Sequence, residues 1–246
     1  NKTLGSYNVE SRSDHTYLNP KKRENYLFNS KINGIEEADF ILLIGSNPRY
    51  EATILNARIR KAYLQNKTKI ISLNDVGDLT YPYESLDGNI ENIKKITEDN
   101  HEVSSLIKEA KKPLIIFGQS SLKSKYAKYI VESIKSFLEK NNKISEEWNS
   151  LNIISENAST VGSFDLGLYK TKDGSNEVLK DLESHKFEIV YLLGVDNLNF
   201  EKKNEFIIYQ GSHGDKGAEM ADIILPGAAY TEQNGYFTNL EGKLQK

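Results

Sequence analysis

The chain has 246 residues, 38% of them hydrophobic, which is enough to bury one large core or two smaller ones. Its net charge of -3, with 32 basic residues interleaved among 35 acidic ones, gives no basic footprint for nucleic acid. The absence of cysteine excludes disulfides, thiolate zinc sites, cysteine-ligated iron-sulphur clusters and cysteine nucleophiles within these residues.

The first regular elements follow a polar start. Residues 1–37 are rich in Asn, Lys and Ser, and we expect an extended lead-in with one short helix near "ENYLFN". From Ala38, "ADFILLIGSNP" is an apolar run that stops at Gly45, as is typical of a strand buried on both faces of a parallel sheet. The next stretch, "YEATILNARIRKAYLQN", has the spacing of an amphipathic helix. "KIISL" and "HEVSSLIKEAKK" then predict a strand and a helix.

The strand pattern returns in "KPLIIFGQSS" and "FEIVYLLGVDN", each an apolar run followed by glycine and polar turn formers. A helical pattern, "KYAKYIVESIKSFLEK", lies between them, and two short strands are predicted at 206–211 and 221–227. Strands that alternate with helices of this length predict α/β layers with mostly parallel strands. We therefore expect a lead-in over 1–37 and two α/β lobes, 38–112 and 113–246.

One candidate ligand site lies at the end of the first predicted strand. Open α/β sheets bind anions where a strand ends in glycine before a helix, so Gly45 and Ser46 could meet a nucleotide or phosphate, with Arg49 as a charge partner. The same residues equally suit an ordinary tight turn, with Pro48 opening the next helix. Neither GxGxxG nor GxxxxGK[ST] occurs in the sequence, so both readings stay open.

The histidines and carboxylates predict no catalytic group. The four histidines are scattered and none has the HExxH spacing, so no metal site is expected. His213 lies among glycines near Asp215, which could hold the imidazole in one tautomer beside a ligand, or the histidine could simply cap a loop. No spacing of carboxylates marks an acid and base couple.

Three of these stretches resemble one family. "EEADFILLIGSNPRYEATILNARIRKAYL", "EAKKPLIIFGQSSL" and "FIIYQGSHGDKGAEMADIILPGAAYTEQNGYFTNLEGKLQ" are similar to the C-terminal region of the large iron-sulphur subunit of respiratory complex I, the proton-pumping NADH:ubiquinone oxidoreductase, and most to its mitochondrial versions. The likeness runs from about residue 24 to the end, in the same order. It implies the fold of the molybdopterin oxidoreductase superfamily: two Rossmann-like lobes with mostly parallel sheets, which in catalytic members bind a guanine-dinucleotide pterin at the strand carboxyl ends.

The resemblance also implies a role for the strand ends. In complex I this domain is understood to have lost the cofactor and to act as a scaffold, so we expect no catalytic residue, no metal and no functional cofactor site in this chain. A vestigial cleft is expected instead. The residues that match the places where catalytic members meet the dinucleotide are Gly45, Ser46, Asn47, Gly194, Asp196, Gly211, His213, Asn239 and Gly242.

The expected partners are other subunits of the peripheral arm, including a cysteine-rich chain, and iron-sulphur clusters and FMN belong to those partners. The resemblance places the chain on the matrix side of the mitochondrial inner membrane, or on the cytoplasmic face of a bacterial membrane. A direct membrane span is not expected, because the longest apolar runs fall far short of about 20 residues.

The cysteine-rich half of the family's large subunit is missing from these residues, so we expect a split gene or a fragment. Residues 227–246 are expected to be ordered only in the assembly. Two alternatives remain: a fragment of an active molybdopterin oxidoreductase such as a formate dehydrogenase, and a free-standing nucleotide-binding module.

Overall fold

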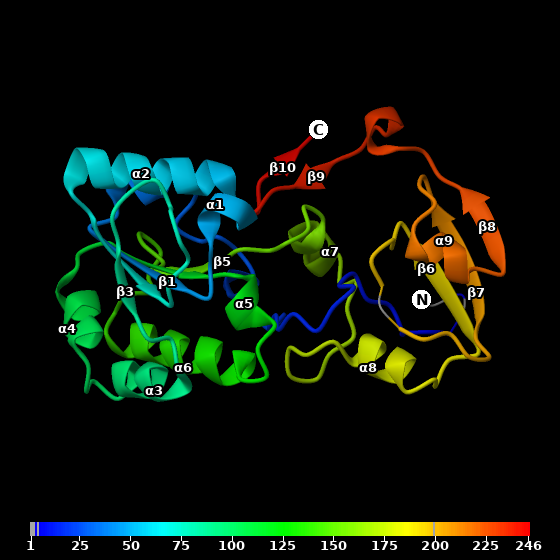
Figure 1. Ribbon diagram of the computed structural model, residues 1–246, viewed down its shortest axis with the longest axis horizontal. Helices are drawn as coiled ribbons and strands as arrows, with labels where there is room; N and C mark the ends of the chain where they lie inside the picture. The colour runs from blue at the N-terminus through cyan, green and yellow to red at the C-terminus, as the bar shows by residue number, and fades with distance from the viewer. Residues whose placement is uncertain (1–2, 4, 199) are drawn as a thin grey trace.

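The computed structural model describes residues 3, 5–198 and 200–246, and it contains two parallel sheets at opposite ends of the molecule (Figure 1). The larger sheet has the strand order β3-β2-β1-β4-β5, with all neighbours parallel. The chain moves outward from β1 in one direction and then starts again at β4, on the other side of β1. The topological switch point therefore lies between β1 and β4. The strands are β1 (Phe40–Ile44), β2 (Lys69–Leu73), β3 (Glu84–Leu86), β4 (Pro113–Phe117) and β5 (Leu151–Ile153).

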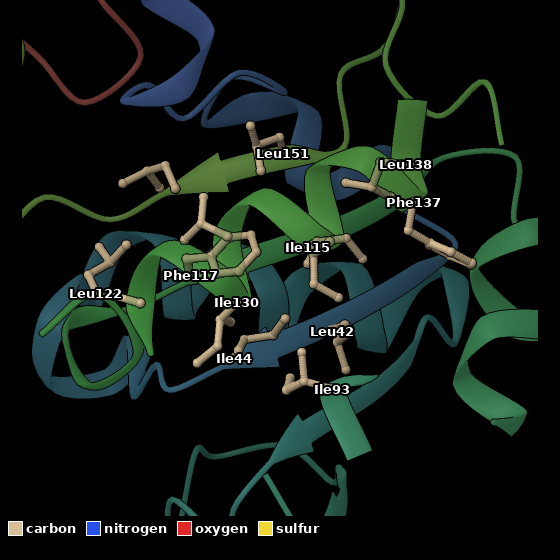
Figure 2. Close-up of a cluster of buried hydrophobic side chains, with 14 of the residues drawn as sticks. Leu42, Ile44, Ile93, Ile115, Phe117, Leu122, Ile130, Phe137, Leu138 and Leu151 are labelled. Atoms are coloured by element: carbon tan, nitrogen blue, oxygen red, sulfur yellow. The ribbon is translucent and has the colours of Figure 1, made fainter. Parts of the chain in front are cut away.

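Strand β1 is buried on both faces, which explains its uninterrupted apolar run. Phe40, Leu42 and Ile44 pack into one hydrophobic cluster, while Ile41 and Leu43 pack into a second cluster on the opposite face. Figure 2 shows the first cluster, in which side chains of β1, β4 and β5 meet those of the covering helices. The central strands are thus held by apolar contacts from both sides.

The helices of the first sheet cover these two faces. Leu55 and Ile59 of α2 belong to the second cluster, whereas Ile93, Ile107 and Ile134 of α3, α4 and α6 belong to the first. In Figure 1, α2 lies on one side of the sheet and α3 and α6 lie on the other. The bounds are α1 (Pro48–Glu51), α2 (Thr53–Asn66), α3 (Ile90–Thr97), α4 (Glu102–Glu109), α5 (Gln119–Leu122) and α6 (Ala127–Lys140).

The expected division after Lys112 differs from this arrangement. Strand β4, which begins at Pro113, pairs with β1 along its whole length. Strand β5 then pairs with β4, so both strands belong to the first sheet. The division between the sheets lies beyond Ile153, before β6. Which strands pair depends on residues far apart in the sequence, so the apolar run of β4 does not indicate which strand lies beside it.

The polar lead-in is also part of the first core. Tyr17 and Leu18 are buried in the first cluster, and Phe28 and Ile35 are buried in the second. Phe28 bridges to Asn152 in antiparallel fashion, so this segment covers the outer edge of β5. Its short 3-10 helices are η1 (Arg23–Asn25) and η2 (Asn33–Glu37).

The smaller sheet has the order β6-β7-β8, again parallel. One of its faces forms a hydrophobic cluster with α8. The cluster includes Leu182 of the helix and Leu192, Ile207 and Tyr209 of the strands. The strands are β6 (Ile189–Leu193), β7 (Phe206–Gly211) and β8 (Ile223–Pro226), and the helices after β5 are α7 (Thr160–Asp165), α8 (Glu177–Glu183) and α9 (Lys216–Met220).

After β8 the chain returns to the first sheet (Figure 1). The Leu240 carbonyl accepts the Phe28 N–H at 3.0 Å, and the Glu241 carboxylate accepts the Ile32 N–H at 2.9 Å. These bonds attach the C-terminal hairpin to the lead-in. The returning elements are η3 (Tyr230–Glu232), β9 (Phe237–Thr238) and β10 (Leu244–Gln245), the last two antiparallel.

A buried carboxylate in the second lobe predicts a pH dependence. Glu205 accepts the Lys203 N–H at 2.7 Å and lies 2.6 Å from His185 Nδ1, and these bonds lower its pKa to about 2. Because the folded-state pKa is depressed, this stabilisation is complete above the ordinary pKa near 4.5 and is lost as the pH falls toward 2. We expect Glu205→Gln to be less stable than the wild type at pH 7, with the difference shrinking between pH 4.5 and 2. Urea unfolding followed by circular dichroism measures it, and a pH-independent difference would contradict the assignment.

Candidate functional site

The turn after β1 is the first part of the expected cleft. Gly45 has a φ of +55°, a left-handed conformation that favours glycine, and Ser46 is 1% exposed. The Asn47 side chain accepts the Arg49 N–H at 3.2 Å and donates to the Val76 carbonyl at 2.8 Å. Asn47 therefore caps α1 and ties this turn to the loop after β2.

The turn after β4 packs directly against the turn after β1. A Cβ added at Gly118 would lie 2.3 Å from Ser46 Cα, and one added at Gly45 would lie 2.4 Å from the Ser121 nitrogen. Both distances are far below van der Waals contact. The two strand ends at the switch point therefore meet backbone to backbone.

Glu51 joins these two turns. Its Oε1 accepts the Asn47 N–H at 2.8 Å, and its Oε2 accepts the Gln119 N–H at 3.1 Å. In an open α/β sheet, backbone amides at such turns are the donors that bind anionic ligands. Here a carboxylate of the chain itself takes both donors. The sequence offered one weak signal for this role: an acidic residue in the first turn of the helix that follows a glycine turn.

Arg49, the candidate charge partner beside Gly45, pairs with an aspartate of the chain. Its guanidinium donates to the Asp78 carboxylate at 2.8 Å and to the Asp78 carbonyl at 2.7 Å. Together with the Thr80 N–H, which has the larger effect, this pairing lowers the pKa of Asp78. In this structure the Arg49 guanidinium is therefore paired within the chain. A nearby aspartate in the β2–β3 connection takes the cation, and spacing along the sequence could not reveal it.

A cavity of about 340 Å³ lies at the same edge of the first sheet. It lies between α1, the segment after β5 and the C-terminal hairpin. Ser155 Oγ lies at the cavity and, within the described residues, has no hydrogen-bond partner; the same holds for Ser46 Oγ and Gln119 Oε1 in the adjoining turns. The lining residues include Glu51, Ile154, Ser155, Asn157, Phe237 and Asn239.

The hairpin brings two of the expected residues to the first sheet. Asn239 and Gly242 form its turn, with the Gly242 N–H donating to the Asn239 carbonyl at 2.9 Å. Asn239 also lines the cavity beside Glu51. The Gly242 carbonyl accepts from Arg23 at 3.0 Å, and that guanidinium also binds Asp165 at 2.8 and 2.9 Å. The two residues therefore form a turn that hydrogen bonds hold to the lead-in.

The remaining expected residues lie at the ends of β6 and β7 in the second sheet. The Tyr209 hydroxyl donates to the Asp196 carboxylate and lies 2.9 Å from the His213 carbonyl oxygen. The carboxylate stabilises the protonated phenol and so raises the pKa of Tyr209. Gly194 has a φ of +63°, and nothing lies within 4 Å of a Cβ added there. The Gly211 carbonyl accepts the Gly227 N–H at 2.8 Å, which extends the pairing of β7 with β8.

The His213 imidazole has a different neighbour from the one expected. Its Nδ1 lies 2.8 Å from Ser212 Oγ, and Asp215 serves instead as the residue before α9, where its carbonyl accepts the Ala218 N–H at 2.9 Å. His213 is exposed. The expected residues thus form one group around the cavity of the first sheet and another at the second sheet.

Over residues 3, 5–198 and 200–246, no three His, Asp or Glu side chains converge as metal ligands. Over the same positions, no helix has the length and apolar character needed to cross a membrane.

The chain is similar in sequence to known proteins over most of its length. The chain is 40% identical over 240 residues to the NADH-ubiquinone oxidoreductase 75 kDa subunit of Reclinomonas americana, which covers 97% of this chain and 34% of that protein. It is 40% identical over 241 residues to a subunit of the NADH-quinone oxidoreductase of Rickettsia bellii, again with 34% of that protein covered. The mitochondrial 78 kDa subunit of Neurospora crassa is 40% identical over 227 residues, 29% of its length.

The chain thus spans about a third of the length of these relatives. The molybdopterin oxidoreductase family matches residues 1–246, the whole of the chain. This match confirms the fold predicted from the resemblance, with mostly parallel α/β sheets. The chain therefore belongs to the molybdopterin oxidoreductase family.

Proposed function

We infer that this chain is a non-catalytic scaffold of the peripheral arm of proton-pumping NADH:ubiquinone oxidoreductase. Its relatives named above are subunits of NADH oxidoreductases of the quinone and ubiquinone type. In this proposal electrons from NADH pass through FMN and iron-sulphur clusters held by other chains, one of them rich in cysteine. The chain would act on the matrix side of the mitochondrial inner membrane, or on the cytoplasmic face of a bacterial one, as a split-gene half or a fragment of the large subunit.

One observation carries the scaffold role: the Glu51 carboxylate accepts hydrogen bonds from the amides of Asn47 and Gln119. A pterin dinucleotide carries phosphates, and these would need the same donors. They would also meet a carboxylate at short range, where like charges repel. The two turns also pack closely, because a Cβ added at Gly118 would lie 2.3 Å from Ser46 Cα. The residues at the switch point do not fit the family's cofactor, which supports a structural use of the fold.

The alternative is a fragment of an active molybdopterin oxidoreductase, such as a formate dehydrogenase. The observation in its favour is the cavity of about 340 Å³ beside Asn239, which has the unpartnered Ser155 Oγ in its wall within the described residues. Under this reading a partner chain supplies the metal ligand. Molybdenum in the purified chain would be its signature.

Native electrophoresis of gently solubilised membranes tests the proposal. We expect the chain in a very large band with NADH dehydrogenase subunits and a separate cysteine-rich chain, identified by mass spectrometry, and without molybdenum by elemental analysis. The scaffold needs its neighbours, so it should not run alone. A small band, or comigration with a molybdenum protein, would refute the proposed function and favour the alternative.

A further inference from the structure

We propose that the open face of the β6-β7-β8 sheet is a docking surface for an amphipathic helix. The helix belongs to the polypeptide that corresponds to the two thirds of the relatives' length lying outside the matched region. This inference rests on the proposed function, because it places the chain beside the remainder of a 75 kDa-type subunit. The surface is hereafter called the open face.

The strand register defines the open face. Tyr191 of β6 pairs with Ile208 of β7, which pairs with Ile223 of β8, so these three side chains point to one side of the sheet. Large apolar side chains on this side are strongly exposed: Ile189 by 67% and Leu193 by 68%. The apolar residues of the open face are Ile189, Tyr191, Leu193, Phe206, Ile208, Ile223 and Leu225.

The exposure is abnormal for this class of sheet. Parallel sheets occur almost only with helices on both faces, and the first sheet of this chain has a hydrophobic cluster on each side. The second sheet has one cluster, on the side of Leu192, Ile207 and Tyr209. Within the described residues, the opposite side lacks a comparable cover. A contiguous apolar patch of this kind marks an interaction site.

The chemistry of the open face suits an apolar partner. The positions that the register places on it carry no charged side chain. Its two polar side chains are linked, because the Tyr191 hydroxyl donates to the Gln210 side-chain carbonyl on the neighbouring strand. An aliphatic surface could therefore cover the face at little desolvation cost to polar groups.

The dimensions fit one helix. Three strands about 4.8 Å apart make a strip roughly 10 Å wide, which matches the helix diameter of about 10–12 Å. Strands of five residues are about 16 Å long, which corresponds to a helix of roughly 11 residues. The occupant is thus a helix of about three turns with an aliphatic stripe facing the sheet.

The length of the relatives suggests a source for such a helix. The chain covers 34% of the Reclinomonas and Rickettsia relatives and 29% of the Neurospora relative, so about two thirds of each relative's polypeptide lies outside the match. That polypeptide is the nearest available source of the missing helical layer. A second copy of this chain paired through its own open face would place sheet against sheet, whereas parallel α/β sheets are covered by helices.

Photo-crosslinking in the native membrane assembly tests the inference. Benzoylphenylalanine is placed at Leu193 and, as a matched control, at Ile54 of α2, which is 69% exposed. We expect an adduct from position 193 whose peptide aligns with the part of the 75 and 78 kDa relatives outside the matched region, and none of that kind from position 54. An adduct with a second copy or with an unrelated protein, or no adduct at position 193, would overturn the inference.

A charge substitution provides a second readout. Leu193→Glu should lower the fraction of chain in the large assembly at least tenfold, while circular dichroism and the urea midpoint of the purified full chain stay at wild-type values, because Leu193 is exposed in the chain alone. Ile54→Glu should leave assembly unchanged. Equal losses in both variants would overturn the inference. A wild-type chain that comigrates with NADH dehydrogenase subunits but gives no adduct at position 193 refutes the docking surface alone. Failure to comigrate refutes the proposed function as well.

Discussion

Gly45→Val is expected to lower the free energy of unfolding of the first lobe by roughly 2–5 kcal/mol, the sum of left-handed backbone strain and overpacking. The added Cβ would lie 2.4 Å from the Ser121 nitrogen and 2.8 Å from the Ser121 Cβ, and the φ of +55° disfavours a branched side chain. Backbone atoms cannot move aside as the tip of a flexible side chain can. Urea unfolding followed by the fluorescence of Trp148, the sole tryptophan, measures the change.

Gly194→Val is the matched control for this prediction. Gly194 has a similar φ of +63°, but nothing lies within 4 Å of its added Cβ. Only the backbone strain remains, and we expect about 1–2 kcal/mol from it, read by circular dichroism. In the membrane assembly, Gly45→Val should reduce the amount of complex without altering turnover per assembled complex. Equal destabilisation by the two variants, or normal assembly with low turnover, would contradict the account of this turn.

Arg12→Ala is expected to cost about 3–5 kcal/mol, because it leaves the buried Glu10 carboxylate without its cation. The two side chains are 3% and 4% exposed, and the Arg12 guanidinium binds the carboxylate at 2.6 and 2.9 Å. It also donates to the carbonyls of Thr16 and Gly174, at 2.7 Å each. Arg12 therefore joins the lead-in to the segment before α8, and urea unfolding by circular dichroism measures its removal.

The ion pair of Arg23 and Asp165 is an exposed counterpart of the buried Arg12–Glu10 pair. It has similar bidentate geometry, at 2.8 and 2.9 Å, but its guanidinium is 50% exposed. Solvent screening limits such a pair to about 1 kcal/mol or less, so Arg23→Ala should have a small effect. Replacing both Arg12 and Glu10 by Met should recover most of the loss, because no uncompensated charge remains. If Arg12→Ala were no worse than Arg23→Ala, burial would not be what makes the first pair important.

Much of the local structure follows from pattern alone. The run from Phe40 to Ile44 is apolar at every position because both faces of β1 are buried, and the 3.6-residue spacing identifies α2 and α6. Which strands lie side by side does not follow. β4 and β6 share the same motif of an apolar run followed by glycine, yet one joins the first sheet and the other opens the second.

In the candidate site, too, the sequence predicts local positions but not the partners of each side chain. Placing Gly45 at a strand end followed from the glycine after the apolar run, and the structure has it there. The role of Glu51 depends on Gln119, which is 68 positions away, and the partner of Arg49 is 29 positions away. Such distances along the chain lie beyond any local pattern. Asn239 is placed beside the first sheet only because the chain returns from β8.

The attachment of the C-terminal hairpin to the lead-in has a consequence for biosynthesis. Ile32 and Glu241 are 209 positions apart, and Phe28 donates to the Leu240 carbonyl across a similar separation. Contacts this distant along the sequence close late, because the loop entropy must be overcome first. On the ribosome, the lead-in emerges long before its partner, so the first sheet must wait for nearly the whole chain before this edge is sealed. During that interval the lead-in lacks the hydrogen bonds that the hairpin will supply.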